Sequence, residues 1–147
     1  MLFGAMLTDA QMSQLYEATW TPPPATANID LSAMPSGLVG YWPMDSTAED
    51  VSGTELHGTL VAPEFVTGHW GRAFFFDGDD ALVVSDNGRS PLDVSAVLMM
   101  AWVMPSQYDV QADRGIVMNK ESAYEFGLED ASGKLQGAFG PGCWRWW

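Results

Sequence analysis

Residues 37–84 have the sequence GLVGYWPMDSTAEDVSGTELHGTLVAPEFVTGHWGRAFFFDGDDALVV, which carries the clearest structural pattern of the chain. Three short apolar runs, LVGYW, AFFF and ALVV, are separated by polar segments that are rich in Gly and Asp. Short apolar runs that alternate with such turn residues are typical of antiparallel all-β domains. The stretch therefore predicts a β-sandwich that begins at Gly37.

The pattern continues beyond this stretch. Tyr124, Phe126 and Leu128 fall on one face of a strand by period-two alternation, whereas Glu125 and Glu129 fall on the other. The segment AVLMMAWVM is apolar on both faces, which predicts a central strand that is covered on both sides. No long helix is expected after residue 36. The expected strands are residues 38–44, 57–62, 73–77, 81–85, 97–104, 116–120, 124–129 and 134–139.

The N-terminal residues predict a short strand followed by a helix. Residues 2–7 are mostly apolar, and the sequence TDAQ that follows has the form of a capping box. In this motif the Thr8 hydroxyl caps the helix and the Gln11 side chain reaches back to the cap. The sequence MSQLY at residues 12–16 then places Met, Leu and Tyr on one helical face. We expect about two to three helical turns that end near Ala18.

Residues 37–147 resemble a LamG-like domain, which is a jelly-roll β-sandwich of the concanavalin A-like superfamily of lectins and glucanases. The resemblance rests on the motifs GLV-x-YW-x-x-D, HGTL and GRAF-x-FDG-x-D-x-x-V, and on the later segments VLMMAWVMPS and GIVMNKESAYEFGLED. Residues 1–18 resemble the strand and helix with which such modules end. The resemblance implies an all-β fold, a concanavalin A-like jelly roll, with one short N-terminal helix.

The resemblance divides the chain into three segments. Residues 1–18 are expected to be the tail of a preceding LamG-like module, and residues 37–147 a LamG-like β-sandwich that is incomplete at its C-terminus. Residues 19–36 contain three consecutive prolines, which favour an extended linker. An alternative is that the N-terminal strand and helix fill part of the gap in the sandwich, as in a circular permutation.

Charge and composition exclude several classes of function. The chain has 6 Lys and Arg against 19 Asp and Glu, so its formal net charge is −13. A surface this negative repels nucleic acid, and it suits either cations or solubility alone. No apolar run approaches the roughly 18 residues of a membrane span. The N-terminus lacks the basic region of a signal peptide, so an extracellular or cell-surface location is implied only by the family resemblance.

Acidic residues provide the candidate metal ligands. Asp77, Asp79 and Asp80 cluster in FDGDDALVV, and calcium prefers six to eight oxygen ligands of this kind. The resemblance adds a structural calcium near this region or near Asp50 in the preceding polar loop. That loop has Thr-Glu-Leu at residues 54–56, where the family commonly has Gly and Asn. The alternative for the acidic cluster is a plain Asp-Gly hairpin turn.

Glu125 and Glu129 are the candidate catalytic residues. Glucanases of this fold carry a Glu-x-Asp-x-Glu strand, but here Gly127 replaces the middle aspartate. On a regular strand the two carboxylates are about 13 Å apart. A retaining glycosidase needs about 5.5 Å, so the alternative of a solvent-exposed acidic strand face is favoured and no catalytic residue is expected.

The remaining candidates are aromatic, thiol and imidazole groups. Trp144, Trp146 and Trp147 are suited either to stacking on sugar rings or, as is more common in a sandwich, to the core. Cys143 is the only cysteine, so an intrachain disulfide is excluded. His57 has no Cys or His partner at metal-ligand spacing, which indicates a position at a turn or strand edge.

These observations favour a non-catalytic binding or adhesion module of an extracellular multidomain protein. Its expected partners are glycans or another surface protein, engaged through loops at the rim of the sandwich, with calcium as the one candidate cofactor. Two alternatives remain open. One is a glycoside hydrolase or lyase of the same fold, and the other is a structural spacer that only sets the distance between neighbouring domains.

Overall fold

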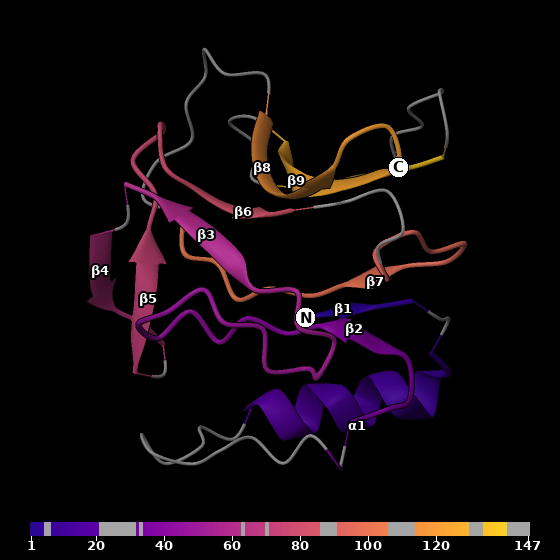
Figure 1. Cartoon of the computed structure of the whole chain (residues 1–147). Coiled ribbons are helices and arrows are strands. Elements are labelled where there is room, and N and C mark those ends of the chain that lie inside the picture. The colour runs from indigo at the N-terminus through magenta and orange to yellow at the C-terminus, as the bar shows by residue number, and fades with distance from the viewer. Residues whose placement is uncertain are drawn as a thin grey trace. The chain divides into compact units, whose positions relative to one another are not determined.

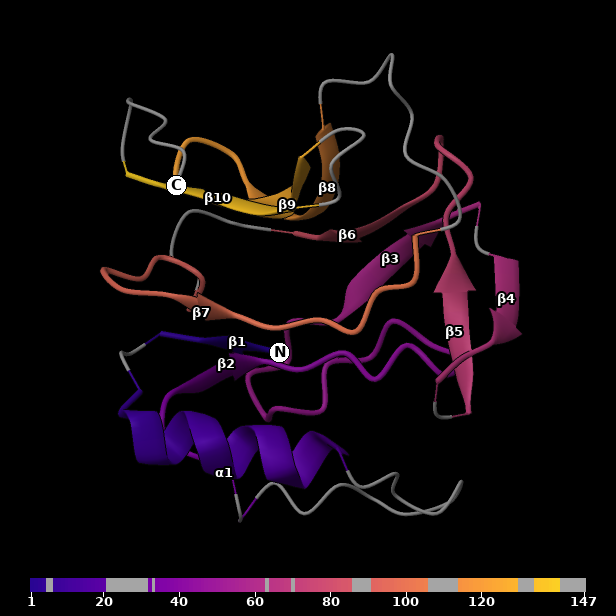
Figure 2. The same ribbon diagram turned by 180° about the vertical axis from the view of Figure 1, so that it is seen from behind.

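The computed structural model describes residues 1–4, 7–20, 32, 34–62, 64–69, 71–85, 91–105, 114–129 and 134–140. The chain divides into two compact units, Met1–Leu98 and Met99–Trp147. Within the described ranges it consists mainly of short strands in small antiparallel sheets, with one short α-helix (Figures 1 and 2). The predicted all-β class with a short N-terminal helix is therefore confirmed. None of the described helical residues forms a segment long and apolar enough to span a membrane.

All eight expected strands after residue 37 overlap an observed one. The strand β4, with the sequence EFVT, was not expected, because its four residues are too few to show a clear alternation. The elements are β1 (Leu2–Phe3), α1 (Asp9–Trp20), β2 (Leu38–Gly40), β3 (Gly58–Val61), β4 (Glu64–Thr67), β5 (Arg72–Phe75), β6 (Ala81–Val84), β7 (Leu98–Met99), β8 (Arg114–Lys120), β9 (Tyr124–Glu129) and β10 (Leu135–Phe139).

Helix α1 begins with the expected capping box. The backbone N–H of Thr8 donates to Gln11 Oε1 (2.9 Å), and the N–H of Gln11 donates to Thr8 Oγ1 (3.3 Å). These reciprocal bonds satisfy two donors that a helix start otherwise leaves without partners. Leu15 is 2 % exposed and anchors the apolar face, but Met12, expected on the same face, is 42 % exposed. The helix ends at Trp20, two residues beyond the expected position.

Strand β1 lies in the middle of a three-stranded sheet with the order β2-β1-β7. It runs antiparallel to β2, with Leu2 opposite Gly40, and the N–H of Gly4 donates to the carbonyl of Gly37 (2.9 Å). The N-terminal segment therefore shares a sheet with the first strand of the expected sandwich. This is the pairing that the circular-permutation alternative requires, and the boundaries at residues 18 and 36 stay predictions.

Strands β3 to β6 form two antiparallel pairs, one nested inside the other. The inner pair is β4 with β5, and a tight turn closes it where the N–H of Gly68 donates to the carbonyl of Gly71 (3.0 Å). Gly71 has φ of +63°, and a Cβ there would meet Asp45 Oδ1 at 2.6 Å, so a larger residue is disfavoured on both grounds. The outer pair is β3 with β6. The two pairs are separate sheets, and β4 and β5 lie side by side in Figure 1.

The expected Asp-Gly hairpin between β5 and β6 is wrong. These strands pair with β4 and β3, not with each other. Two residues, 62 and 63, join β3 to β4, whereas five residues, 76–80, join β5 to β6. Ala62 on the short connection and Gly78 on the long one both have positive φ, +48° and +123°. The acidic segment is thus the longer of the two links between the nested pairs.

The second unit contains the antiparallel sheet β10-β9-β8. Tyr124 is 2 % exposed and stacks on Phe139 with ring centroids 6.5 Å apart, whereas Phe126 and Leu128 on the same face of β9 are only partly buried. Glu125 on the other face is only 6 % exposed, and Asn119 Nδ2 donates to its Oε2 (2.7 Å). The expected solvent-exposed acidic face is therefore wrong at Glu125, because a cross-strand amide replaces water as its hydrogen-bond donor.

The expected central strand at residues 97–104 is largely absent. Only Leu98–Met99 pairs as β7, and the apolar run that follows is not covered on both sides. Trp102 and Val103 are 48 % and 46 % exposed, and Met104 is 88 % exposed. Apolar composition alone cannot distinguish a covered strand from an uncovered one. The apolar run therefore led to a wrong prediction of a central strand here.

Several expectations fall outside the described residues. They concern most of the proline-rich linker, the aromatic segment that follows Gly140 with Cys143, Trp144, Trp146 and Trp147, and the side chain of Glu129. The carboxylate separation between Glu125 and Glu129 is therefore untested.

The capping box gives a direct test of the N-terminal helix. Thr8→Ala removes the acceptor for the Gln11 N–H, and we expect it to lower the free energy of unfolding by about 1 kcal/mol. Ser13→Ala, an exposed hydroxyl inside the same helix, is the matched control and should change it by less than about 0.5 kcal/mol. Urea denaturation followed by circular dichroism measures both. Equal losses in the two variants would contradict the role of the cap.

Candidate functional site

The loop of residues 41–57, between β2 and β3, is the most extensively hydrogen-bonded irregular segment among the described residues. It folds back on itself, because the N–H of Val51 donates to the carbonyl of Tyr41 (2.9 Å). Its Asp45 Oδ1 accepts the N–H of Arg72 (3.1 Å), which ties the loop to the start of β5. Trp42 donates its indole N–H to the carbonyl of Leu56 (2.9 Å) and closes the loop from one side.

Asp50 organises this loop through its carboxylate. The side chain is 5 % exposed, and five donor atoms lie within hydrogen-bond distance of its two oxygens. Oδ1 accepts the backbone N–H groups of Tyr41 and Ser52, both at 2.9 Å. Oδ2 accepts the N–H of Leu56 (3.0 Å) and the hydroxyls of Ser52 (2.9 Å) and Thr54 (2.8 Å). A buried carboxylate is stable when donors of this kind replace its water.

The electrostatics agree with this geometry. Burial raises the pKa of Asp50, but the hydrogen bonds from Tyr41, Ser52 and Thr54 outweigh burial and hold this pKa below its ordinary value. The amino group of Met1 lies in the same region. Burial lowers its pKa to about 6, and the negative charge of Asp50 acts in the opposite direction. The carboxylate thus stays ionised while the nearby amine is disfavoured as a cation.

The backbone of Asp50 is also fixed. Its N–H donates to His57 Nδ1 (3.2 Å), which assigns the ring proton of the neutral imidazole to Nε2. The histidine therefore has a structural role at the edge of β3, consistent with the sequence-based expectation. Next to it, the N–H of Gly58 donates to the carbonyl of Ala48 (2.8 Å) and aligns the loop with β3.

Asp50 does not belong to the group formed by the other predicted metal ligands. Its oxygens are already surrounded by donors, so a cation there would have to displace hydrogen bonds. Thr54 and Leu56, which depart from the Asn-rich loop of LamG-like domains, are two of the residues that supply these donors. The sequence signal for this role is the spacing Asp50-x-Ser52-x-Thr54, in which a short acid precedes two hydroxyls that can cap it.

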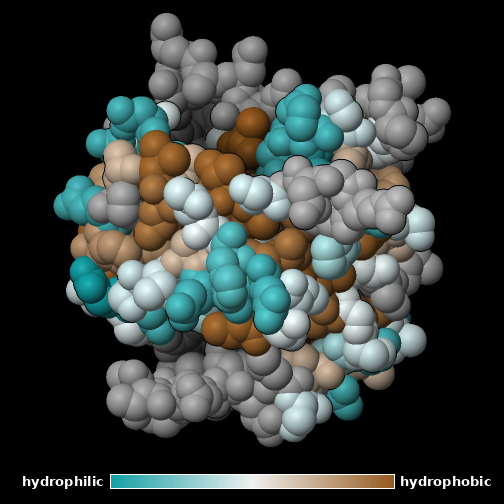
Figure 3. All heavy atoms as spheres, viewed as in Figure 1, coloured by the Kyte–Doolittle hydropathy of each residue, from teal (hydrophilic) through white to brown (hydrophobic). Residues whose placement is uncertain are grey.

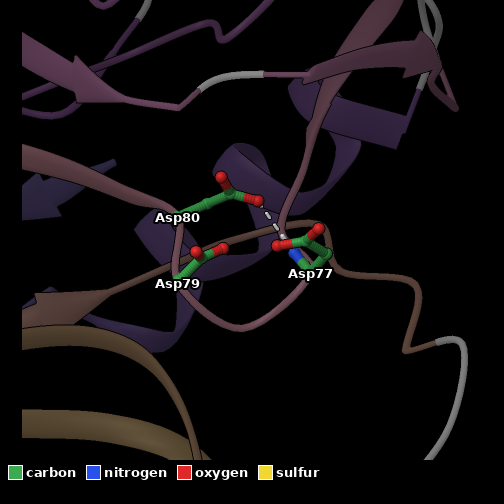
Figure 4. A group of neighbouring side chains, drawn as sticks. All are labelled: Asp77, Asp79 and Asp80. Atoms are coloured by element: carbon green, nitrogen blue, oxygen red, sulfur yellow. Dashed lines mark hydrogen bonds between the residues drawn. The ribbon is translucent and has the colours of Figure 1, made fainter.

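Asp77, Asp79 and Asp80 do come together, as expected. One carboxylate oxygen of each lies within 4.8 Å of the others, and the side chains converge above the turn (Figure 4). The N–H of Asp77 donates to Asp80 Oδ2 (2.9 Å), which holds the turn in shape. Hydrogen bonding with Asp79 and the negative charge of Asp80 raise the pKa of Asp77. Both effects favour the protonated form of Asp77, and a bound cation would offset the negative charge of the group.

The ribbons on either side of this turn expose apolar side chains. Val61 and Val83 on the outer pair are 45 % and 49 % exposed, and Val66 and Phe75 on the inner pair are each 37 % exposed. Figure 3 shows hydrophobic residues in brown at the surface beside hydrophilic ones in teal. Exposed apolar residues that gather on strands mark binding surfaces more often than isolated ones do.

Comparison with known proteins identifies no family, because no family model, curated protein or solved structure matches this chain. The resemblance to LamG-like domains therefore stays a prediction that rests on the sequence motifs.

The Asp50 network predicts a large effect from a small change. In Asp50→Asn one carboxylate oxygen becomes an NH2 donor, which faces the donors of the loop, and the other becomes a weaker, uncharged acceptor. We therefore expect the free energy of unfolding to fall by about 2 kcal/mol or more. Glu49→Gln, the same chemical change on the exposed neighbour, should cost less than about 0.5 kcal/mol. Urea titration at neutral pH compares the two.

The same network sets the sign of the acid dependence. Because the pKa of Asp50 is lower in the folded protein than in the unfolded chain, its contribution is fully present above the unfolded value. It is lost as the pH falls through the folded value, below about pH 4. The difference in stability between the protein and Asp50→Asn should therefore shrink in acid. A difference that stays constant down to pH 2 would contradict this role.

Proposed function

We propose that this chain is a non-catalytic binding module of an extracellular or cell-surface multidomain protein. Its fold would be a LamG-like, concanavalin A-like jelly roll, and its ligand a glycan or another surface protein. The observation that carries the proposal is the set of half-exposed apolar side chains on the strands of the first unit, at Val61, Val66, Phe75 and Val83. A protein gains little from such exposure unless a partner covers it.

The antiparallel all-β architecture supports the proposal. Small antiparallel sheets joined by long loops are a common scaffold for recognition, because loops and strand edges can vary without loss of the core. The net charge of −13 argues against nucleic acid as the partner.

The environment of Glu125 supports a non-catalytic role. Its carboxylate is 6 % exposed and accepts a hydrogen bond from Asn119 at 2.7 Å. A general acid or nucleophile must reach its substrate, and this geometry directs the carboxylate to a neighbouring strand. The hydrolase alternative is therefore less favoured than binding.

A binding screen tests the proposal. The purified chain is applied to a glycan array and to a panel of extracellular-matrix and cell-surface proteins. We expect at least one specific interaction, with a dissociation constant in the micromolar range that is typical of single modules. The variant Val61→Thr/Val83→Thr reports whether the exposed strands take part. Silence on both panels would favour the spacer alternative and would contradict the binding function.

We also propose that the group of Asp77, Asp79 and Asp80 binds calcium at low affinity. The three carboxylates supply oxygen ligands, and carbonyls of the turn and water would complete the shell. Because Asp77 and Asp79 are exposed, the cation would remain partly hydrated, which limits its affinity.

Thermal melting tests the calcium proposal. We expect millimolar calcium to raise Tm by about 3 °C, because a ligand that binds only the folded state stabilises it. Asp79→Asn/Asp80→Asn should abolish this shift, and Glu49→Gln should leave it unchanged. Sodium chloride at matched ionic strength controls for screening. An equal shift with sodium chloride, or in the double variant, would count against a site.

A further inference from the structure

The outer pair of strands has one face that nothing in the described residues covers. Side chains alternate along β3 and β6, and the register places Thr59 opposite Val83 and Val61 opposite Ala81. Thr59, Val61 and Val83 are exposed, and we call the side of the sheet on which they lie the ribbon face. The opposite side lies against the loop of residues 41–57, because a Cβ on Gly58 would meet Leu82 at 2.6 Å and Ala48 of that loop at 3.2 Å.

The ribbon face is uncovered along its edges as well. Among the described residues β3 pairs only with β6, and β6 pairs only with β3. A two-stranded ribbon of this kind is marginal alone and offers backbone groups on its outer edges to a further extended strand. An extended segment can therefore contact the apolar face and pair with an edge at the same time, which is a common mode of peptide recognition.

The charge beside the ribbon face selects the kind of segment. The connection that leads into β6 carries Asp77, Asp79 and Asp80, and Phe76 next to them is 49 % exposed. Hydrogen bonding with Asp79 and the negative charge of Asp80 raise the pKa of Asp77, and a cationic side chain nearby would offset that charge. A basic side chain can also contact an exposed aromatic ring such as that of Phe76. The protein already contains a contact of this kind, since the Arg72 guanidinium lies 4.7 Å from the centroid of the Phe65 ring.

We propose that the ribbon face binds an extended segment of a partner protein in which Lys or Arg alternates with apolar residues. This inference rests on the proposed binding function and names the partner class for it. The apolar side chains of the segment would cover Val61 and Val83, and its basic side chains would lie beside the acidic connection and Phe76. Charge complementarity favours this occupant over an acidic peptide, and it increases the association rate as well as the affinity.

Fluorescence anisotropy with designed probes tests the inference. The probes are labelled peptides of the sequences KVKVKVK, KSKSKSK and EVEVEVE, titrated with the full 147-residue chain. We expect KVKVKVK to bind at least about tenfold more tightly than either of the others, because only it satisfies both the apolar and the charge requirement. Raising sodium chloride from about 50 to about 300 mM should weaken this binding, since the charges are exposed.

Variants locate the binding to the ribbon face. Val61→Thr/Val83→Thr keeps the β-branched shape and should weaken KVKVKVK binding about threefold to tenfold. Val51→Thr, which changes a valine 39 % exposed on the loop, is the matched control and should leave it unchanged. Asp79→Lys/Asp80→Lys should reverse the preference toward EVEVEVE, a gain that misfolding does not produce. Urea midpoints verify that each variant is folded.

The outcomes separate this inference from the binding function. Equal binding of KVKVKVK and KSKSKSK, or no effect of the valine and lysine variants, would overturn the ribbon face as the site. If the chain binds a glycan or a surface protein in the wider screen and the variants leave that binding intact, the binding function stands and this inference fails. If neither the peptide titrations nor the wider screen detects binding, both this inference and the proposed binding function are overturned.

Discussion

The structure of the first unit depends on one buried carboxylate. Asp50 gathers donors from the end of β2, from its own turn and from the approach to β3, so that a long polar loop becomes an ordered element. A hydrogen bond to an ionised group contributes more than a neutral one, and removing a buried acceptor leaves several donors without partners. The loop in turn supplies an acceptor on Asp45 to the first residue of β5 and one on Ala48 to the first residue of β3, and so holds the starts of these two strands.

The nested ribbons follow from that anchoring. Between the starts of β3 and β5 the chain forms β4, which pairs with β5, and β6 then pairs with β3 to complete the outer pair. The connection from β5 to β6 is the longer one, and the acidic segment lies in it. Gly78 adopts the positive φ that the turn requires, and the Asp80 side chain accepts the Asp77 N–H. Together they give the segment a defined turn. The clustering of carboxylates is thus a consequence of the bend, whatever ligand it attracts.

The core of the described residues is small. The most buried apolar side chains are few, and five of them lie in the first unit, namely Leu2, Leu15, Ala48, Phe74 and Leu92. Side chains of similar character on β3 and β6 remain half exposed. A surface with this composition is suited to a partner that brings apolar groups, and the high negative charge around it selects among partners by sign. Glu125 in β9 is buried and accepts a hydrogen bond from Asn119, which agrees with the proposed binding role.

The sequence by itself determined the class of the fold, the position of nearly every strand after residue 37 and the capped N-terminal helix. These features depend on local rules, namely period-two alternation, turn residues and side chains that cap neighbouring amides. The sequence also brought Asp77, Asp79 and Asp80 together, because their separation along the chain is short. Only the tertiary structure decided which strands pair, that β1 joins β2, that β5 and β6 do not form a hairpin, and that Asp50 and Glu125 are buried among donors. Those outcomes depend on contacts between residues far apart in the chain, and a local pattern does not contain the identity of the partner strand or of the donor across it.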